Sequence, residues 1–179
     1  EKTFAKMYQT PLPYWNEYQW PVQAVVDDPA LIVQPGQVKD ITACMKGDKL
    51  SWDAPDGEWE IVRMGMVPTY VENGPALKDG IGLEVDKMSK KHLRSHFDAF
   101  IGEIYKRIPE ADRKTWKVVV ADSYEKGGQN FTDDFLESFE KKYGYNELPF
   151  LHLYKGVVVE SQQATDRVFC DMRKMVAER

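Results

Sequence analysis

Apolar residues follow two different periods in the middle of the chain. The segments 59–67 and 116–121 are rich in consecutive apolar residues, which is typical of strands buried on both faces of a parallel sheet. After Ser89, and again after Thr132, apolar residues recur every three to four positions, which predicts two helices with these residues as N-caps. The order strand, helix, strand, helix predicts an α/β fold with a parallel sheet and right-handed crossovers.

The C-terminal part continues this alternation with shorter elements. Gly144 is predicted to follow the end of the second helix, and the runs 151–154 and 157–159 are strand candidates. A last amphipathic helix is predicted to begin at Ser161 or Thr165.

Residues 1–58 differ from the rest in pattern. Prolines interrupt them repeatedly, and four aromatic residues cluster between positions 14 and 20. The Pro and Asp-Gly of 54–57 predict a turn between two strands. Short extended pieces are predicted at 22–26, 31–33 and 38–41. We interpret 1–58 as an irregular, β-rich lead-in and 59–179 as an α/β domain.

Composition excludes several classes of function. The chain has 179 residues with 42% hydrophobic residues, which is typical of a soluble globular protein with a real core. Its net charge of −5 and lack of a basic run argue against a nucleic-acid partner. No apolar run approaches the roughly 20 residues of a membrane span. Cys44 and Cys170 show no metal-ligand spacing and are expected to be free thiols.

A polar loop follows the second apolar segment and holds the first candidate chemistry. Asp122, Ser123 and Glu125 come directly after the predicted strand, before a pair of glycines. In α/β folds, ligands and catalytic groups gather at the carboxyl ends of strands, so these carboxylates are candidates for acid/base chemistry. The alternative is structural, with Asp122 capping the following turn and Glu125 capping the loop or pairing with Lys126.

Three more polar residues are candidates for contact with a polar substrate. Gln129 and Asn130 carry amides suited to vicinal hydroxyl groups, although such amides also stabilise loops. Arg63 interrupts an apolar segment, and a buried Arg must be paired. Asp122 or Asp86 is the expected partner, either in a scaffold ion pair or within the site.

Carboxylates also precede the first predicted helix. Glu84 and Asp86 are candidates for substrate binding, or for calcium as oxygen ligands, but they also favour the positive end of a helix. They lack the Asp-x-Asp-x-Asp-Gly pattern, so no metal ligand is assigned. His92 and His96 lie four residues apart without a third ligand, and a helix face explains them better than zinc.

Several longer motifs resemble the α-L-rhamnosidases of glycoside hydrolase family 106. The matching stretches, in the family's order, are WPVQAVV (20–26), LSWDAPDGEWEIVRMG (50–65), NGPALKDGIGLEVDKMS (73–89), HFDAFIG (96–102), ADSYEKGGQNFTDDF (121–135), FEKKYGYN (139–146) and DRVFCDMRKMVAER (166–179). The resemblance implies a (β/α)8 catalytic domain with a β-rich appendage, acting on terminal rhamnosyl bonds of complex glycans. It also implies inversion with two acidic residues, a calcium ion near the sugar and a location outside the cytoplasm.

Within this resemblance, Glu125 is the glutamate of the DSYE motif and the expected general acid. An inverting glycosidase needs such an acid and a second carboxylate that activates water. A complete (β/α)8 barrel needs about 250 residues, so about half a barrel is expected here, with the second carboxylate beyond Arg179. A partial barrel leaves surfaces uncovered, which predicts association with another copy or with the missing half.

Two other interpretations remain open at this stage. The chain could be a non-catalytic relative that keeps carbohydrate contacts as a binding or interaction domain. It could also be an α/β hydrolase of another kind, although no Gly-x-Ser-x-Gly motif supports that.

Overall fold

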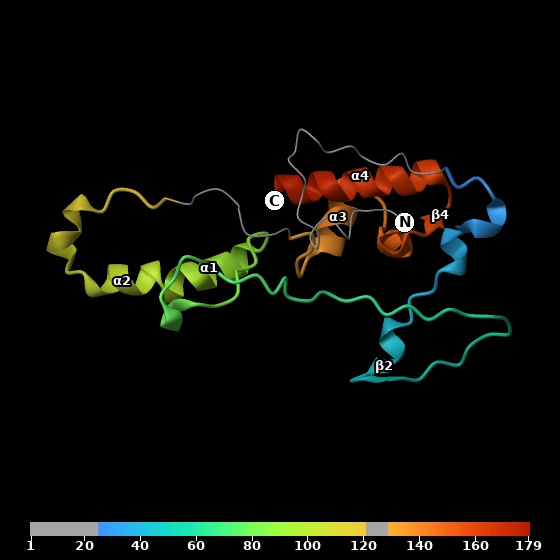
Figure 1. Ribbon diagram of the computed structural model, residues 1–179, viewed down its shortest axis with the longest axis horizontal. Coiled ribbons are helices and arrows are strands. Elements are labelled where there is room, and N and C mark those ends of the chain that lie inside the picture. The colour runs from blue at the N-terminus through green and yellow to red at the C-terminus, as the bar shows by residue number, and fades with distance from the viewer. Residues whose placement is uncertain (1–24, 121–128) are drawn as a thin grey trace. The chain divides into compact units, whose positions relative to one another are not determined.

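The computed structural model describes residues 25–120 and 129–179 (Figure 1). Contacts divide the chain into two units. The first unit joins the described residues up to Gly65 with Leu136–Met175, and the second joins the described residues of Met66–Phe135 with Val176–Arg179. The predicted boundary at residue 58 remains a prediction.

Among the described residues, the first unit contains two small sheets. Strand β1 (Ile32–Val33) pairs in parallel with β4 (Val158–Val159), and Ile32 lies opposite Val158. Strands β2 (Met45–Lys46) and β3 (Lys49–Leu50) form an antiparallel hairpin around Gly47, which has a φ of 59°. The parallel pair confirms the strand predictions at 31–33 and 157–159. The predicted hairpin around 54–57 is wrong, because β2 and β3 pair around Gly47 instead.

The core of the first unit lies around helices α3 (Phe135–Tyr143) and α4 (Gln162–Glu178). The hydroxyl oxygen of Ser161 accepts a hydrogen bond from the Ala164 amide at 3.0 Å, which confirms Ser161 as the start of the last helix. Gly144 follows α3 with a φ of 78°, as predicted. Buried apolar side chains in this unit are Phe139, Phe150, Leu153, Val158, Val159, Ala164, Val168, Met172 and Met175.

The second unit contains helices α1 (Lys90–Ala99) and α2 (Ile101–Arg107) (Figure 1). The hydroxyl oxygen of Ser89 accepts from the His92 amide at 3.3 Å, so the predicted N-cap is confirmed. A single helix was expected from Ser89 to Pro109, but Phe100, at φ −115° and ψ −81°, separates α1 from α2. Each helix is short enough that its stability depends on packing against another surface.

Several predicted strands are not formed. Residues 59–67 and 116–120 lie outside helices and strands, because no neighbouring strand completes a ladder with them. Residues 151–154 lie in a 3₁₀-helix, Leu148–Lys155. The repeated parallel strands of a half-barrel are not present in the described part of the chain, so that architecture remains a prediction.

The predicted cap at Thr132 is also wrong. Helix α3 begins at Phe135, and the Thr132 hydroxyl donates to Asp86 instead. No helix formed by the described residues combines the length and apolar character needed to cross a membrane.

Candidate functional site

The predicted site residues fall into three groups. Asp122, Ser123 and Glu125 lie outside the described residues. Arg63 belongs to the first unit, whereas Glu84, Asp86, Gln129 and Asn130 belong to the second unit. The second unit therefore holds the polar residues whose geometry can be examined together.

Asp86 is the centre of a hydrogen-bond network in the second unit. Its Oδ2 accepts from the Thr132 hydroxyl at 2.6 Å, and its Oδ1 accepts from the Met88 amide at 2.9 Å. The Gln129 side-chain amide also donates to Asp86 Oδ1. The bonds from Gln129 and Thr132 join residues more than 40 positions apart, so the segment before α1 and the segment before α3 are fixed to each other.

Gln129 is fully engaged within this network. Its Nε2 donates to Asp86 and to the Phe131 carbonyl oxygen, the latter at 3.1 Å, and its Oε1 accepts from the Lys87 amide at 3.1 Å. A Gln side chain has two N–H donors, and both are used here. Gln129 therefore has no donor left for a sugar hydroxyl in this conformation. We call Asp86, Gln129, Thr132 and the amides of Lys87 and Met88 the Asp86 frame.

The frame keeps Asp86 ionised. Partial burial acts to raise the pKa of Asp86, but the hydrogen bonds from Thr132, Gln129 and Met88 together outweigh it and hold the pKa below its ordinary value. His92 adds a weaker favourable electrostatic contribution. The carboxylate consequently stays charged at neutral pH, where it is the better hydrogen-bond acceptor.

Asn130 lies between Gln129 and Thr132 in the sequence, but it differs from both in its hydrogen bonding. It is half-buried, and its side-chain amide forms no hydrogen bond with any described residue. Its neighbours Gln129 and Thr132 are held by Asp86. Asn130 thus presents a donor and an acceptor that no residue in the described part of the chain uses.

Two ion pairs flank the frame. Glu84 Oε2 accepts from Lys87 Nζ at 2.7 Å, three residues along the chain. His92 Nε2 lies 2.8 Å from Asp133 Oδ2, so His92 has a carboxylate partner rather than a metal-binding arrangement. This pairing agrees with the interpretation of His92 and His96 as helix-face residues.

The expected burial of Arg63 is wrong. Its side chain is 76% exposed, and its Nη2 lies 3.9 Å from Asp48 Oδ1 of the same unit. Residues 59–67 do not join a sheet, so Arg63 extends into solvent and its pair with Asp48 is worth little. Arg63 is not brought together with the Asp86 frame by any described contact.

The described residues do not fit a calcium ion. No group of three or more His, Cys, Asp or Glu side chains in the described part of the chain is arranged to hold a metal. Asp86 already accepts from N–H and O–H donors, which point positive hydrogen atoms at the oxygens that a cation would need. Glu84 is paired with Lys87, whose ammonium would repel a cation.

Thr132 and Lys87 are frame residues that the sequence did not single out as site residues. Thr132 was interpreted only as a helix cap, and its complete burial gives the hydroxyl no access to water. The Lys87 contribution comes from its backbone amide, which no side-chain pattern reveals. The motifs indicated that the segments around Lys87 and Thr132 are characteristic of a family, but not that the two segments contact each other.

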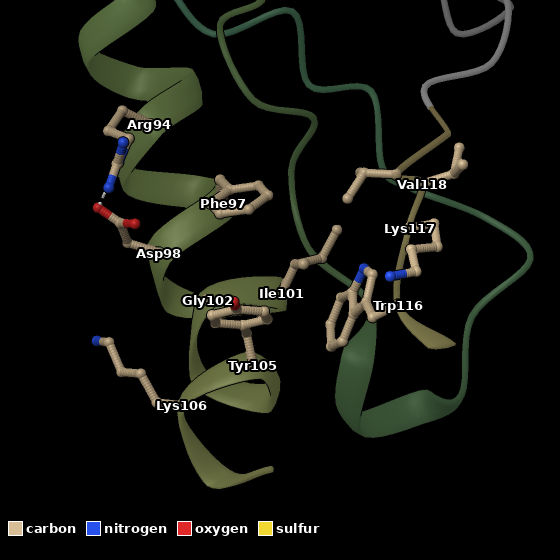
Figure 2. Close-up of a pocket in the computed structure, with 11 residues that line it drawn as sticks. Arg94, Phe97, Asp98, Ile101, Gly102, Tyr105, Lys106, Trp116, Lys117 and Val118 are labelled. Carbon is tan, nitrogen blue, oxygen red and sulfur yellow. Dashed lines mark hydrogen bonds and ion pairs between the residues drawn. The ribbon is translucent and has the colours of Figure 1, made fainter. Parts of the chain in front are cut away.

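The second unit also contains an apolar groove of about 440 Å³. Figure 2 shows Phe97, Ile101 and Tyr105 of α1 and α2 on one side and Trp116 and Val118 on the other. The Tyr105 and Trp116 rings are 5.4 Å apart in an edge-on arrangement. This is the contact expected between an amphipathic helix and an apolar strand, although residues 116–120 form no strand.

A second titratable group stands out in the first unit. Glu147 is 1% exposed, and neither of its carboxyl oxygens has a hydrogen-bond partner among residues 25–120 and 129–179. Burial raises its pKa to about 8. A raised pKa is typical of general acids, but a side chain this enclosed gives a substrate no access, so Glu147 is a feature of the core.

A family model and a solved structure both name rhamnosidases, and a curated relative carries a different name. Residues 3–179 match the glycoside hydrolase family 106 description, alpha-L-rhamnosidase. The "Putative beta-glucuronidase" of Formosa agariphila is 35% identical over 148 residues, which is 82% of this chain and 13% of that protein. A solved structure of a rhamnosidase from Novosphingobium sp. PP1Y matches with a TM-score of 0.66 and 28% identity, covering 81% of this chain and 14% of that one.

The chain therefore spans only a small share of the length of these relatives. It matches 13% of the Formosa protein and 14% of the Novosphingobium structure. The sequence motifs and the three-dimensional similarity identify the same kind of protein.

Proposed function

This chain belongs to the alpha-L-rhamnosidases of glycoside hydrolase family 106, and from that membership we propose that it is part of an enzyme that cleaves terminal α-L-rhamnosyl bonds in complex glycans. The observation that carries the proposal is the family match across residues 3–179. The rhamnosidase structure from Novosphingobium supports it independently, at 28% identity. The polar frame in the second unit lies in the same segments as two of the most specific motifs, GLEVDK and DSYEKGGQNF.

In this proposal Glu125 is the general acid. It donates a proton to the glycosidic oxygen as the bond to the anomeric carbon breaks, and the proton leaves with the aglycone. A second carboxylate takes a proton from water, whose oxygen attacks the opposite face of the sugar and inverts the anomeric carbon. This second group is assigned to a part of the parent protein outside these residues, in the remainder of a (β/α)8 barrel.

The remaining predicted residues assist binding in this scheme. Asn130 offers its amide to vicinal hydroxyl groups, and Asp122 and Ser123 contact the sugar or orient Glu125. The scheme uses protein groups alone, because no donor set among the described residues fits calcium. Action outside the cytoplasm, and association with another copy or with the rest of the barrel, complete the proposal.

The decisive test is made in the parent protein, which also holds the second carboxylate, and compares wild type with Glu125→Gln on two rhamnosides. We expect hydrolysis of methyl α-L-rhamnoside to fall by about 10²- to 10⁴-fold in the variant, because loss of a general acid has that effect. The fall should be smaller with 4-nitrophenyl α-L-rhamnoside, whose leaving group needs little protonation. The exposed acid Glu137, changed to Gln, is the matched control and should hydrolyse both substrates at the wild-type rate. Equal rates for wild type and Glu125→Gln would remove Glu125 from the mechanism.

This chain covers only a small share of its relatives' length, and this favours a second candidate function. If the parent protein lacks the second carboxylate, these residues act as a carbohydrate-binding or interaction domain without catalysis. Binding of L-rhamnose with no detectable hydrolysis of either rhamnoside would favour this alternative. Hydrolysis of both substrates would exclude it.

A further inference from the structure

The strongest unassigned feature is the contrast between Asn130 and the residues around it. Asp86 accepts three hydrogen bonds, and Gln129 uses both of its N–H donors inside the protein. Thr132 is fully buried and directs its hydroxyl to Asp86. Asn130 alone among these residues is half-buried with an amide that no described residue engages.

This contrast distinguishes residues that hold the segment in place from the residue that is able to contact a ligand. A polar side chain whose donors and acceptors are already used within the protein has little to offer a ligand. A half-buried amide with free donors and acceptors can bind a hydroxyl group while losing little hydration. The backbone on both sides of Asn130 is held by Asp86, through Gln129 before it and Thr132 after it.

We propose that Asp86 is a positioning residue that acts through Gln129 and Thr132 to hold Asn130, whose amide then contacts a carbohydrate hydroxyl group. This inference rests on the proposed function, because the carbohydrate ligand is taken from it. Holding the backbone on both sides of a contact residue reduces the conformational entropy lost on binding. Asp86, Gln129 and Thr132 accordingly affect sugar affinity without touching the sugar.

The alternative within the same cluster is that Asp86 binds the sugar directly. Its position argues against this, because three donors already surround its two oxygens. The exposed Asp133 provides a matched comparison. It lies in the same segment and pairs with His92 instead of the frame.

The test measures amide hydrogen exchange and L-rhamnose affinity on the same four proteins, all in the full 179-residue chain: wild type, Asp86→Ala, Asn130→Ala and Asp133→Ala. Asp86→Ala should speed exchange of the Lys87 and Met88 amides and weaken L-rhamnose binding, each by about tenfold, the effect of losing one hydrogen bond. Asn130→Ala should weaken binding by a similar factor and leave both amides unchanged. Asp133→Ala should change neither quantity.

A pair of more conservative variants tests the same role if Asp86→Ala does not fold. Thr132→Val removes the hydroxyl at constant shape, and Thr132→Ser restores it. The valine variant should speed exchange at Met88 and weaken L-rhamnose binding, and the serine variant should recover both. A purely structural role would loosen the amides without changing affinity.

Two results would overturn the positioning role. One is unchanged exchange at Lys87 and Met88 in both Asp86→Ala and Thr132→Val. The other is a loosened frame with wild-type L-rhamnose affinity. If the wild-type chain binds neither L-rhamnose nor the 4-nitrophenyl rhamnoside, the proposed function and the assignment of Asn130 both fall, while the exchange data still decide whether Asp86 organises this segment.

Discussion

Helices α4 and α1 are both amphipathic, yet only α4 buries its apolar face. On α4, Val168 and Met172 are at most 1% exposed, whereas on α1, Leu93 is 47% exposed and Phe97 is 37% exposed. The difference lies in their surroundings, because α4 packs in a unit with a parallel strand pair and a buried core. A helical pattern therefore specifies a helix, but a partner surface is needed before its apolar face contributes to stability.

The largest expected effect distinguishes the two units directly. Phe139 is fully buried, and its ring contacts those of Tyr143 and Tyr145. The substitution Phe139→Ala should lower the free energy of unfolding by about 3–5 kcal/mol. Phe97→Ala makes the same chemical change on a partly exposed residue and should have a much smaller effect. Urea unfolding followed by circular dichroism measures both. Equal losses would show that the α1 face is as well packed in solution as the core of the first unit.

The next effect depends on pH and belongs to the core of the first unit. Because burial raises the pKa of Glu147 to about 8, the folded chain holds a proton that the unfolded chain releases above about pH 4.5. The sign follows from linkage: stability is greatest at low pH and decreases as pH rises toward 8. Between pH 5 and pH 7 the decrease should be about 3 kcal/mol, at about 1.4 kcal/mol per pH unit.

Glu147→Gln isolates this contribution, since glutamine has the same shape and does not titrate. Urea unfolding at pH 5 and pH 7 should show a smaller difference in the variant than in wild type. An identical pH dependence in the two proteins would mean that Glu147 reaches solvent or a partner in solution.

A moderate effect of the opposite sign is expected in the second unit. Hydrogen bonds hold the pKa of Asp86 below its ordinary value, so its contribution is present above about pH 4 and is lost as pH falls through the folded-state pKa. Asp86→Asn should destabilise the second unit by about 1–2 kcal/mol at neutral pH. It should also reduce the loss of stability on acidification. Amide exchange at Met88 across pH 3–7 would report this, and a variant with the wild-type acid dependence would contradict it.

The smallest effect belongs to the surface of α1. Arg94 Nε donates to Asp98 Oδ2 at 2.8 Å, but both side chains are exposed (Figure 2). Exposed ion pairs contribute little because solvent screens them and ordering the side chains opposes the attraction. Asp98→Asn should leave the thermal unfolding midpoint unchanged, with Phe97→Ala as the comparison on the same helix. A clear shift of the unfolding midpoint for Asp98→Asn would indicate that the Arg94–Asp98 pair is less exposed to solvent in solution than in the structure.

The sequence by itself determined the helix starts at Ser89 and Ser161, the end of α3 before Gly144, and the family. Ser89, Ser161 and Gly144 were identifiable because caps depend on residue type and a few neighbouring positions. The motif series identified glycoside hydrolase family 106, since a long ordered set of motifs is specific in a way that composition is not. It also singled out Asp86, before the first helix, and Gln129 and Asn130, in the loop before the second, as separate polar candidates.

Only the tertiary structure decided which residues meet. The strand predicted at 116–121 depended on a neighbouring strand that local sequence cannot supply, and Val120 is 81% exposed without it. Arg63 was expected to be buried for the same reason. Thr132 was expected to accept from a backbone amide as a helix cap, but α3 begins at Phe135 and the Thr132 hydroxyl donates to Asp86, 46 positions away. Local propensity is encoded within a few residues, whereas ladders, buried faces and hydrogen-bonded frames depend on distant segments approaching each other.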